Sequence, residues 1–399
     1  MAEIIIDEAK IHELLTKTVE EVIDLEHLKN RLYRGDRLRI KFGIDPTANI
    51  LHLGHSIPLR KLKQFQNLGH QVIFLIGDFT AKIGDPSGRS ASRPSLTDKE
   101  IRENMKNYVK LAAKILDIKK IEIRYNSEWF VKEKADFMMK FLSMFTYGQL
   151  KAREEFKQRI KKGIDITLEE MTYPLLQGYD SVALKADIEI GGTDQKFNLL
   201  MGRKVQKKFN LPGQDIMTLS LLEGIDGERK MSKSYGNFIA LNESPSQMYA
   251  KIMSIPDTLI WRYMDLLTDI PSGTIEELRK SVGSVERKNA KHRLSHEVTF
   301  IYHGSKEAEF AAEEFNRVFR EKNAPQEIKE IKFNKNEAGI IEILMKSGLI
   351  SSVSEAKRLV SQGAVEVNNQ KISGWDTMVE IKGGVIIKIG PRRFFKAVE

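Results

Sequence analysis

The stretch that decides the fold reads Gly43-Ile44-Asp45-Pro46-Thr47-Ala48-Asn49-Ile50-Leu51-His52-Leu53-Gly54-His55. It follows an apolar run at 38–43 that we interpret as a first strand, and it precedes a helical pattern from about His55 to Leu68. Pro58 is compatible with that helix only in its first turn, which places the helix N-terminus beside His55. Backbone N–H groups and the helix dipole favour an anion at such an end.

Short apolar runs alternate with longer amphipathic runs on both sides of this junction, as is typical of βαβ units on a parallel sheet. A second strand is expected at 71–76, a Gly-rich loop at 77–88 and a further strand at 187–190. Ligands of such sheets bind at the carboxyl ends of the strands. We therefore expect an α/β, Rossmann-like domain in which the loops after the strands face one crevice.

The rest of the chain divides by composition. Residues 1–245 are expected to form the Rossmann-like domain, with a basic and aromatic helical insertion at about 128–170. Charged helical patterns follow at 246–325, and a small α+β domain is expected at 336–399. A chain of 399 residues has room for three such units, each with its own core.

The composition restricts the chemistry. The chain has no cysteine, so disulfides and cysteine zinc sites are excluded. No run reaches the roughly 18 apolar residues of a membrane helix, and the first residues lack a secretory pattern, so we expect a soluble, cytoplasmic protein without membrane contact. The net charge of +9 favours an anionic partner such as nucleic acid, while a charge-rich thermophilic surface would explain it as well.

The paired histidines of the first stretch suit phosphate chemistry. His52 and His55 can donate hydrogen bonds to phosphate oxygens as charge develops on them, and Gly54 lets a flat ligand such as adenine approach the backbone. Taken alone, the pair is also compatible with half of a metal site or with two solvated side chains.

A second motif reads Gly227-Glu228-Arg229-Lys230-Met231-Ser232-Lys233-Ser234 and stands among glycines. Its two lysines could close over a triphosphate and neutralise the leaving pyrophosphate, mainly in the transition state. A lone Lys-x-x-Lys is more often an ordinary basic surface loop. The two motifs together, one after the first strand and one after the last, resemble the paired signature of class I aminoacyl-tRNA synthetases.

Three further blocks resemble the bacterial tyrosyl-tRNA synthetases within that class. They read Gly84-Asp85-Pro86-Ser87-Gly88-Arg89, Tyr173-Pro174-Leu175-Leu176-Gln177-Gly178-Tyr179-Asp180 and Gly191-Gly192-Thr193-Asp194-Gln195. The resemblance extends over essentially the whole chain. It implies ATP-dependent activation of L-tyrosine to tyrosyl-adenylate, followed by transfer of tyrosine to the 3' end of tRNA(Tyr).

The resemblance also implies a role for each matching residue. The tyrosine site would comprise Gly43, Asp45, Asp85, Tyr173, Gln177, Asp180 and Gln195. The ATP site would comprise Gly54, Gly192, Asp194, Lys230, Met231, Ser232, Lys233 and Ser234. Catalysis would depend on Thr47, His52, His55, Arg89, Lys230 and Lys233.

Within the tyrosine site, Asp180 would accept a hydrogen bond from the phenol, and Tyr173, Gln177 and Asp85 would hold the ammonium group. The i, i+4, i+7 spacing of Tyr173, Gln177 and Asp180 places them on one face of a helix. A helix face whose polar groups meet solvent is the alternative. Lys41 and Glu189 depart from the family pattern, where a Tyr and a neutral Gln are frequent.

Partners follow from the same resemblance. ATP is expected as a substrate whose phosphates carry Mg²⁺, with no protein-bound metal, and a homodimer is implied with the insertion as its interface. The segment 246–325 would bind the anticodon. The last domain resembles an RNA-binding fold of a ribosomal small-subunit protein, and the residues that could contact phosphates are Lys357, Arg358, Arg392 and Arg393. An oligomerisation or solubility module is the alternative for that domain.

Rival functions remain at this stage. A tryptophanyl synthetase or a small-molecule adenylyltransferase of the same superfamily would normally lack the C-terminal RNA-binding unit. A non-catalytic RNA-binding paralogue would be expected to have lost some phosphate ligands.

Overall fold

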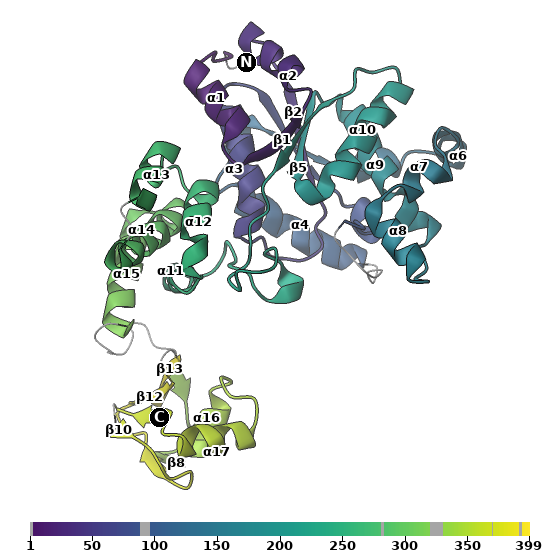
Figure 1. Ribbon diagram of the computed structural model, residues 1–399. Coiled ribbons are helices and arrows are strands. Elements are labelled where there is room, and N and C mark those ends of the chain that lie inside the picture. The colour runs from purple at the N-terminus through teal and green to yellow at the C-terminus, as the bar shows by residue number, and fades with distance from the viewer. Residues whose placement is uncertain (1–2, 88–95, 281–282, 320–329, 369, 391–392) are drawn as a thin grey trace. The chain divides into compact units, whose positions relative to one another are not determined.

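The computed structural model describes residues 3–87, 96–280, 283–319, 330–368, 370–390 and 393–399 (Figure 1). The chain forms two compact units, one of Met1–Ser244 and Lys251–Tyr302 and one of Pro245–Ala250 and His303–Glu399. The helical stretch expected at 246–325 is therefore shared between the two units. One reason is that helix α12 (Ile260–Leu267) packs against α3 (Leu53–Asn67) of the first unit.

The first unit is built on a sheet whose described strands have the order β1-β6-β5-β2-β3-β4. Their bounds are β1 Val19–Ile23, β2 Arg39–Ile44, β3 Gln71–Ile76, β4 Glu122–Tyr125, β5 Ile188–Gly192 and β6 Asp215–Leu219. β1 runs antiparallel to β6, and the other neighbours are parallel. The Rossmann-like parallel sheet is thus confirmed, and β3 has the bounds that its apolar run predicts.

Helices cover both faces of this sheet (Figure 1). α3 lies on one face, and α9 (Leu168–Leu184) and α10 (Lys196–Lys208) lie together on the other. Gly178 permits the close approach of these two, since a Cβ there would lie 2.6 Å from a side-chain carbon of Val205. The unit also contains α1 Glu8–Thr16, α2 Leu25–Arg34 and α4 Asp98–Ala112.

The helix after β2 begins earlier than the position of Pro58 suggests. α3 starts at Leu53 with His52 as its N-cap, so Pro58 is the sixth residue of the helix and not part of the first turn. The prediction of a start beside His55 was therefore wrong by two residues. The Pro nitrogen gives up one bond to the carbonyl of residue 54, which the helix tolerates.

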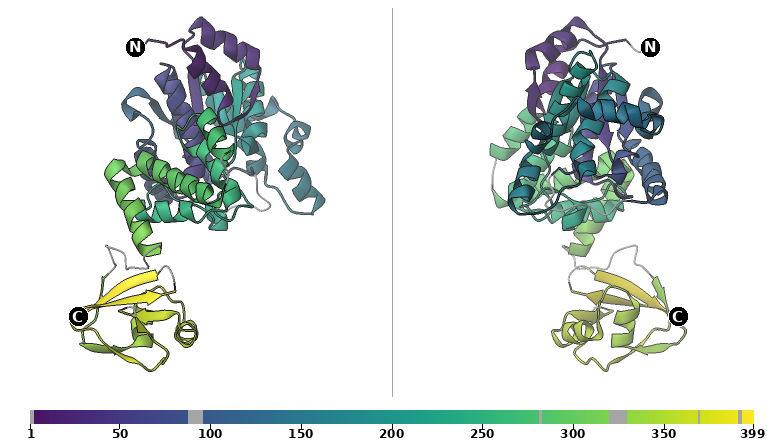
Figure 2. Two further views of the ribbon diagram at one scale, coloured as in Figure 1. Left: turned by 60° about the vertical axis from the view of Figure 1, so that its left-hand side comes forward. Right: turned by 90° about the vertical axis from the view of Figure 1, so that its right-hand side faces the viewer.

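The insertion is helical, as expected. It contains α5 Ser127–Phe130, α6 Ala135–Ser143, α7 Tyr147–Lys151 and α8 Glu154–Lys161. These helices gather beside α9 (Figures 1 and 2). Phe141, Leu150 and Phe156 share a buried cluster with Met171 and Leu175 of α9. The insertion therefore packs against the helix whose polar side chains are expected to bind the substrate tyrosine.

Further helices follow the sheet. They are α11 Pro245–Met253, α12, α13 Ser272–Lys280, α14 Ser284–His303 and α15 Ser305–Phe319. Among the described helices of the whole chain, none combines the length and the apolar character needed to cross a bilayer.

The second unit ends in a small α+β fold, as expected. One sheet has the order β10-β9-β12-β13-β7, and β11 pairs with β8. The bounds are β7 Glu330–Lys332, β8 Glu337–Gly339, α16 Ile340–Lys346, α17 Val353–Ser361, β9 Val365–Val367, β10 Gln370–Lys371, β11 Met378–Glu380, β12 Val385–Ile389 and β13 Arg393–Val398. Alternate residues of β12, Val385, Ile387 and Ile389, are buried against α16 and α17 in one core.

Candidate active site

A cavity of about 340 Å³ opens where the parallel strands end. Its wall includes residues that end or follow β2, β3, β5 and β6, the edge at which such sheets bind ligands. Of the residues expected in the site, those that line it are Gly43, Asp45, Thr47, His52, Gly54, His55, Asp85, Tyr173, Gln177, Asp180, Gly192, Asp194, Gln195, Lys230, Met231 and Ser232. Most of the expected set thus meets in one place.

Two of the expected residues that the structure describes are not in that wall. Lys233 and Ser234 follow it directly, in the short 3₁₀ helix Lys233–Tyr235. Arg89 lies outside the described residues, so its role stays a prediction.

The rings of His52 and His55 lie against each other at the N-terminus of α3, tilted by 50°. Their ring centroids are 3.9 Å apart, and the backbone N–H of His52 donates to Nδ1 of His55 over 3.2 Å. Since Nδ1 of a neutral His55 accepts this bond, its proton is on Nε2, which can donate into the cavity. A Cβ on Gly54 would lie 3.1 Å from the ring of His52, so a side chain at position 54 would crowd this ring and glycine avoids the contact.

Both imidazoles are neutral at pH 7. Burial first, and then the charge of Lys233, lowers the pKa of His55 to about 3. Burial lowers the pKa of His52 further still, with His55, Lys233 and Lys230 acting in the same direction. The pair therefore acts through hydrogen bonds, and the positive charge at this end of the cavity comes from lysines.

Hydrogen bonds of Asn237 stabilise the loop that carries these lysines. Asn237 accepts from the backbone N–H of Ser232 over 2.9 Å and donates to Asp226 over 2.9 Å. Lys230 Nζ lies 2.8 Å from Asp194 Oδ2, and both residues line the cavity. A Cβ on Gly54 would lie 3.9 Å from the Cβ of Met231, so the two motifs lie beside each other.

The expected face of α9 points into the cavity. The Tyr173 hydroxyl donates to Asp45 Oδ2 over 2.9 Å, and Thr80 donates to the other oxygen of Asp45 over 2.7 Å. Burial, together with the charge of Asp45, raises the pKa of Tyr173 well above its ordinary value. The hydroxyl of Tyr173 is therefore neutral and keeps lone pairs for a ligand.

Asp180 is the carboxylate of this face, and its side chain is buried. Its side chain accepts from Trp129 Nε1 over 3.0 Å and from the amide of Asn126 over 3.4 Å. Burial raises the pKa of Asp180 to about 7, although the charge of Lys41 and these two hydrogen bonds oppose the rise. Trp129 and Asn126 were not foreseen from the sequence, because they belong to the segment after β4 and carry no motif.

A second network holds Asp85. Gln195 donates to Asp85 Oδ2 over 2.6 Å, and Ser87 donates to Oδ1 over 2.7 Å through its hydroxyl. Arg153, almost fully buried, donates to Ser87 Oγ over 2.6 Å and also binds Asn198. Sequence reasoning missed Arg153 and Asn198, since a basic residue in a charged helical insertion gives no sign that it is buried.

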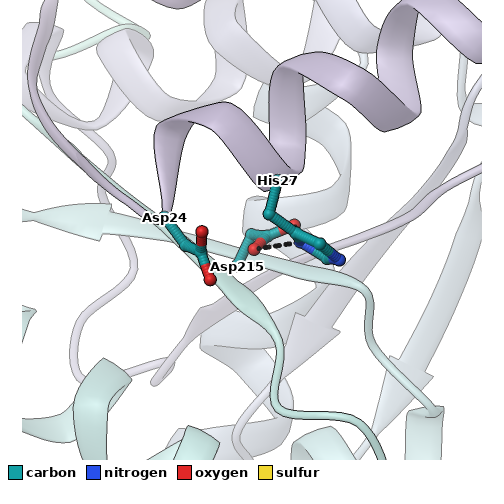
Figure 3. Close-up of side chains that lie close together, drawn as sticks. All are labelled: Asp24, His27 and Asp215. Atoms are coloured by element: carbon teal, nitrogen blue, oxygen red, sulfur yellow. Dashed lines mark hydrogen bonds and ion pairs between the residues drawn. The ribbon is translucent and has the colours of Figure 1, made fainter.

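A cluster outside the cavity could suggest a metal (Figure 3). His27 Nδ1 lies 2.9 Å from Oδ1 of the buried Asp215, while the carboxylate of Asp24 lies within 4.8 Å of both and pairs with Arg203 at 3.3 Å. None of these residues lines the cavity. The arrangement is accounted for by a buried carboxylate that takes a hydrogen bond from His27, and the absence of a protein-bound metal stays a prediction.

The residues expected to bind RNA differ in how they are held. Lys357 and Arg358 are exposed on α17, and Lys357 Nζ lies 4.2 Å above the ring of Trp375. Arg393 donates to the carbonyl of Leu349 over 3.0 Å. Arg392 lies outside the described residues.

Known proteins resemble this chain over nearly its whole length. Residues 33–320 match the family model of class I tRNA synthetases for W and Y, and residues 321–395 match that of the C-terminal domain of tyrosine–tRNA ligases. The tyrosine–tRNA ligase of Thermotoga maritima is 45% identical over 385 residues, which is 96% of each chain. That of Carboxydothermus hydrogenoformans is 46% identical and covers 98% of this chain and 99% of its own.

Solved structures show the same fold. The C-terminally truncated mitochondrial tyrosyl-tRNA synthetase of Aspergillus nidulans matches with a TM-score of 0.66 at 24% identity, over 78% of this chain and 93% of its own. That of Coccidioides posadasii matches with a TM-score of 0.62 at 25% identity, over 76% of this chain and 90% of its own. With the family model over most of the chain and close relatives over nearly all of it, the chain belongs to the class I tRNA synthetases, in the branch of the tyrosine–tRNA ligases.

Proposed function

We propose that this chain is a tyrosine–tRNA ligase that activates L-tyrosine with ATP and transfers it to the 3' end of tRNA(Tyr), both in the cavity described above. The observation that carries the proposal is the meeting of the histidine pair and the lysine loop at a cavity that α9 lines with polar side chains. Family membership supports the substrate assignment.

In the first step the carboxylate of tyrosine attacks the α-phosphorus of ATP, and pyrophosphate leaves. His55 donates through Nε2, and Thr47 and His52 stand beside it to bind the α-phosphate and adenosine. Lys230 and Lys233 balance the charge of the leaving phosphates, which Mg²⁺ accompanies. Such a reaction needs positioning and charge stabilisation and no nucleophilic side chain.

In the second step a ribose hydroxyl at the end of the tRNA attacks the activated carbonyl, and AMP leaves. Gly192 and Asp194 hold the ribose of ATP, and Gln195 lies near the reacting carboxylate. A Cβ on Gly192 would lie 2.8 Å from a side-chain carbon of Leu221, so a larger residue would displace this wall. The cavity thus binds one adenylate through both steps.

The amino-acid pocket recognises both ends of tyrosine. Asp180 accepts from the phenol at the closed end. Tyr173, Gln177 and Asp85 bind the α-ammonium group at the open end. Tyr173 can accept a hydrogen bond there, because its O–H donates to Asp45 and its oxygen lone pairs are left for the ligand. Gly43 and Asp45 complete the floor beside β2.

Tyrosine affinity is expected to fall as the pH drops below about 7. The pKa of Asp180 is raised to about 7 by burial, and its ionised form is the strong acceptor for the phenolic O–H while Trp129 and Asn126 donate to it. The KM for tyrosine in pyrophosphate exchange should rise by roughly tenfold per pH unit well below 7, and stay level from about 7.5 to 8.5. The pKa of His55 lies far lower, so the titration of His55 does not explain a rise of the KM just below pH 7.

The Asp180→Asn variant provides the control, because an amide does not titrate. Its KM for tyrosine should be high and independent of pH over the same range. A wild-type KM that stays level between pH 6 and 8 would contradict the assignment of Asp180 to the phenol.

We also propose a homodimer that buries the surface of the insertion. Four large apolar side chains there are more than half exposed, namely Val131, Met139, Tyr147 and Leu168. Met139→Glu should convert a dimer into a monomer, since an interface does not tolerate an unpaired carboxylate. Sedimentation should then show the mass of a single chain, while Lys110→Glu on α4 leaves the dimer intact; a wild-type chain that is already monomeric at micromolar concentration would refute the proposal.

The remaining parts are assigned to tRNA. The segment 246–325 is proposed to bind the anticodon, and Lys357, Arg358, Arg392 and Arg393 to contact RNA phosphates, all in the cytoplasm. An excess of positive charge over the whole chain supports an RNA partner.

Pyrophosphate exchange with a panel of amino acids tests the proposal. Exchange should depend on tyrosine and should be weak with tryptophan and phenylalanine. Exchange with tryptophan alone would assign the chain to the other branch of its family, and no exchange with any amino acid would favour a non-catalytic RNA-binding role.

A further inference from the structure

A buried ion pair forms part of the wall of the amino-acid pocket. Lys41 Nζ lies 2.9 Å from Glu189 Oε1, and the two side chains are 0% and 1% exposed. The residues are neighbours on the parallel strands β2 and β5, and both line the cavity. A buried ion pair is often no more stabilising than apolar side chains of similar volume, because desolvation offsets the attraction. Stability alone therefore does not explain the pair.

Lys41 has no hydrogen left for a ligand. Besides Glu189, its ammonium group donates to the carbonyl of Gln177 over 2.8 Å and to Ser181 Oγ over 2.8 Å. An ammonium group has three N–H donors, and these three acceptors use them. Lys41 therefore ties β2 to α9, and it does not supply a second contact to the phenol.

Glu189 acts on the side chain of the same glutamine. Its Oε1 accepts from Gln177 Nε2 over 3.1 Å, while its Oε2 accepts from Ser181 over 3.2 Å and also from Gln214. An ionised carboxylate only accepts hydrogen bonds. The NH₂ group of Gln177 must therefore face Glu189, which leaves the carbonyl oxygen of Gln177 on the other side of the amide.

We propose that Lys41 and Glu189 are positioning residues that fix the amide of Gln177 with its carbonyl oxygen turned to the α-ammonium group of the substrate. Lys41 holds the main chain of Gln177, Glu189 holds its side chain, and each neutralises the charge of the other. A glutamine at 189 would not impose this orientation, because an amide both donates and accepts. The inference rests on the proposed function, in which Gln177 binds the ammonium group.

The Glu189→Gln variant tests the orientation with two ligands. L-tyrosine has the ammonium group, and 3-(4-hydroxyphenyl)propanoate lacks it but keeps the phenol and the carboxylate. The KM for tyrosine should rise about tenfold to a hundredfold, as for the loss of a hydrogen bond to a charged group. The inhibition constant of the propanoate should change less than about twofold. Any effect through Asp180 would alter both ligands equally, because both carry the phenol.

A second variant guards against misfolding. Glu189→Gln alone leaves the ammonium group of Lys41 buried without its counter-ion, whereas Lys41→Met/Glu189→Gln removes both charges. The double variant should unfold near the wild-type temperature. Removing Lys41 also changes the charge beside Asp180, but this change acts on the phenol of both ligands alike, so tyrosine should still be weakened by a larger factor than the propanoate. The proposal would be overturned if the KM for tyrosine and the inhibition constant of the propanoate rose by the same factor. It would also be overturned if the double variant kept the wild-type KM for tyrosine.

The outcome is separable from the proposed function itself. Wild-type exchange of pyrophosphate that depends on tyrosine supports the function whatever the variants do. A wild-type chain without that exchange fails the function before the variants are compared.

Discussion

Lys233→Ala is expected to slow the formation of tyrosyl-adenylate by about two to three orders of magnitude, the usual cost of removing one group that stabilises charge in the transition state. Lys233 directly follows Ser232 of the cavity wall, so we expect its ammonium group to reach the phosphates that are proposed to bind beside His52 and His55. Tyrosine affinity should be almost unchanged, since α9 and Asp180 are untouched. Single-turnover formation of the adenylate, followed in a quenched-flow apparatus, gives the rate directly.

A matched control is available on the same loop. Arg229 is also basic, but its guanidinium lies 4.6 Å from the ring centre of Tyr235 and pairs with Asp226, and it does not line the cavity. Arg229→Gln should therefore leave the rate within a few-fold of the wild type. If Lys233→Ala lowered the rate and the tyrosine affinity by the same factor, a general disturbance of the site would explain it, and the role of Lys233 would be refuted.

Asp180→Asn is expected to remove most of the preference for tyrosine over phenylalanine. The carboxylate is buried, and among the described residues Trp129 and Asn126 are its hydrogen-bond donors when the phenolic O–H is missing. Loss of a buried hydrogen bond to a charged group costs about 3 kcal/mol, so kcat/KM for tyrosine should fall by about a hundredfold. Phenylalanine never made this bond, so its kcat/KM should change only a few-fold.

The comparison needs a carboxylate of the same neighbourhood that does not face the cavity. Glu133 meets this requirement, because it accepts from the Tyr179 hydroxyl over 3.3 Å and is absent from the cavity wall. Glu133→Gln should retain the wild-type ratio of the two amino acids in pyrophosphate exchange. A ratio that survives Asp180→Asn would show that another group recognises the phenol.

Sequence reasoning located the site because its motifs are local. The histidine pair and the lysine loop each follow a strand of the parallel sheet, and this topology brings strand ends to one edge. The strands themselves are apolar runs, so their period and position are read with an error of a residue or two. The start of α3 was misplaced because Pro58 was taken as a marker of the first turn, although a helix accepts a Pro deeper inside.

The supporting residues could not be read in the same way. Arg153 is buried against Asn198 only because the insertion folds back on the sheet, and Trp129 reaches Asp180 across 51 positions of the chain. Such pairs depend on tertiary packing and have no spacing of their own. The partnership of Lys41 and Glu189 did leave a signal. Each charge stands between two apolar residues of its strand, and two such opposite charges need each other if the strands are adjacent.

A crystal structure with tyrosine and a non-hydrolysable ATP analogue tests the central claim most directly. We expect the imidazole of His55 and the ammonium groups of Lys230 and Lys233 to lie within hydrogen-bond distance of one triphosphate, with the phenol on Asp180. A nucleotide that binds elsewhere, or that contacts only one of the two motifs while the other faces a separate cavity, would contradict it.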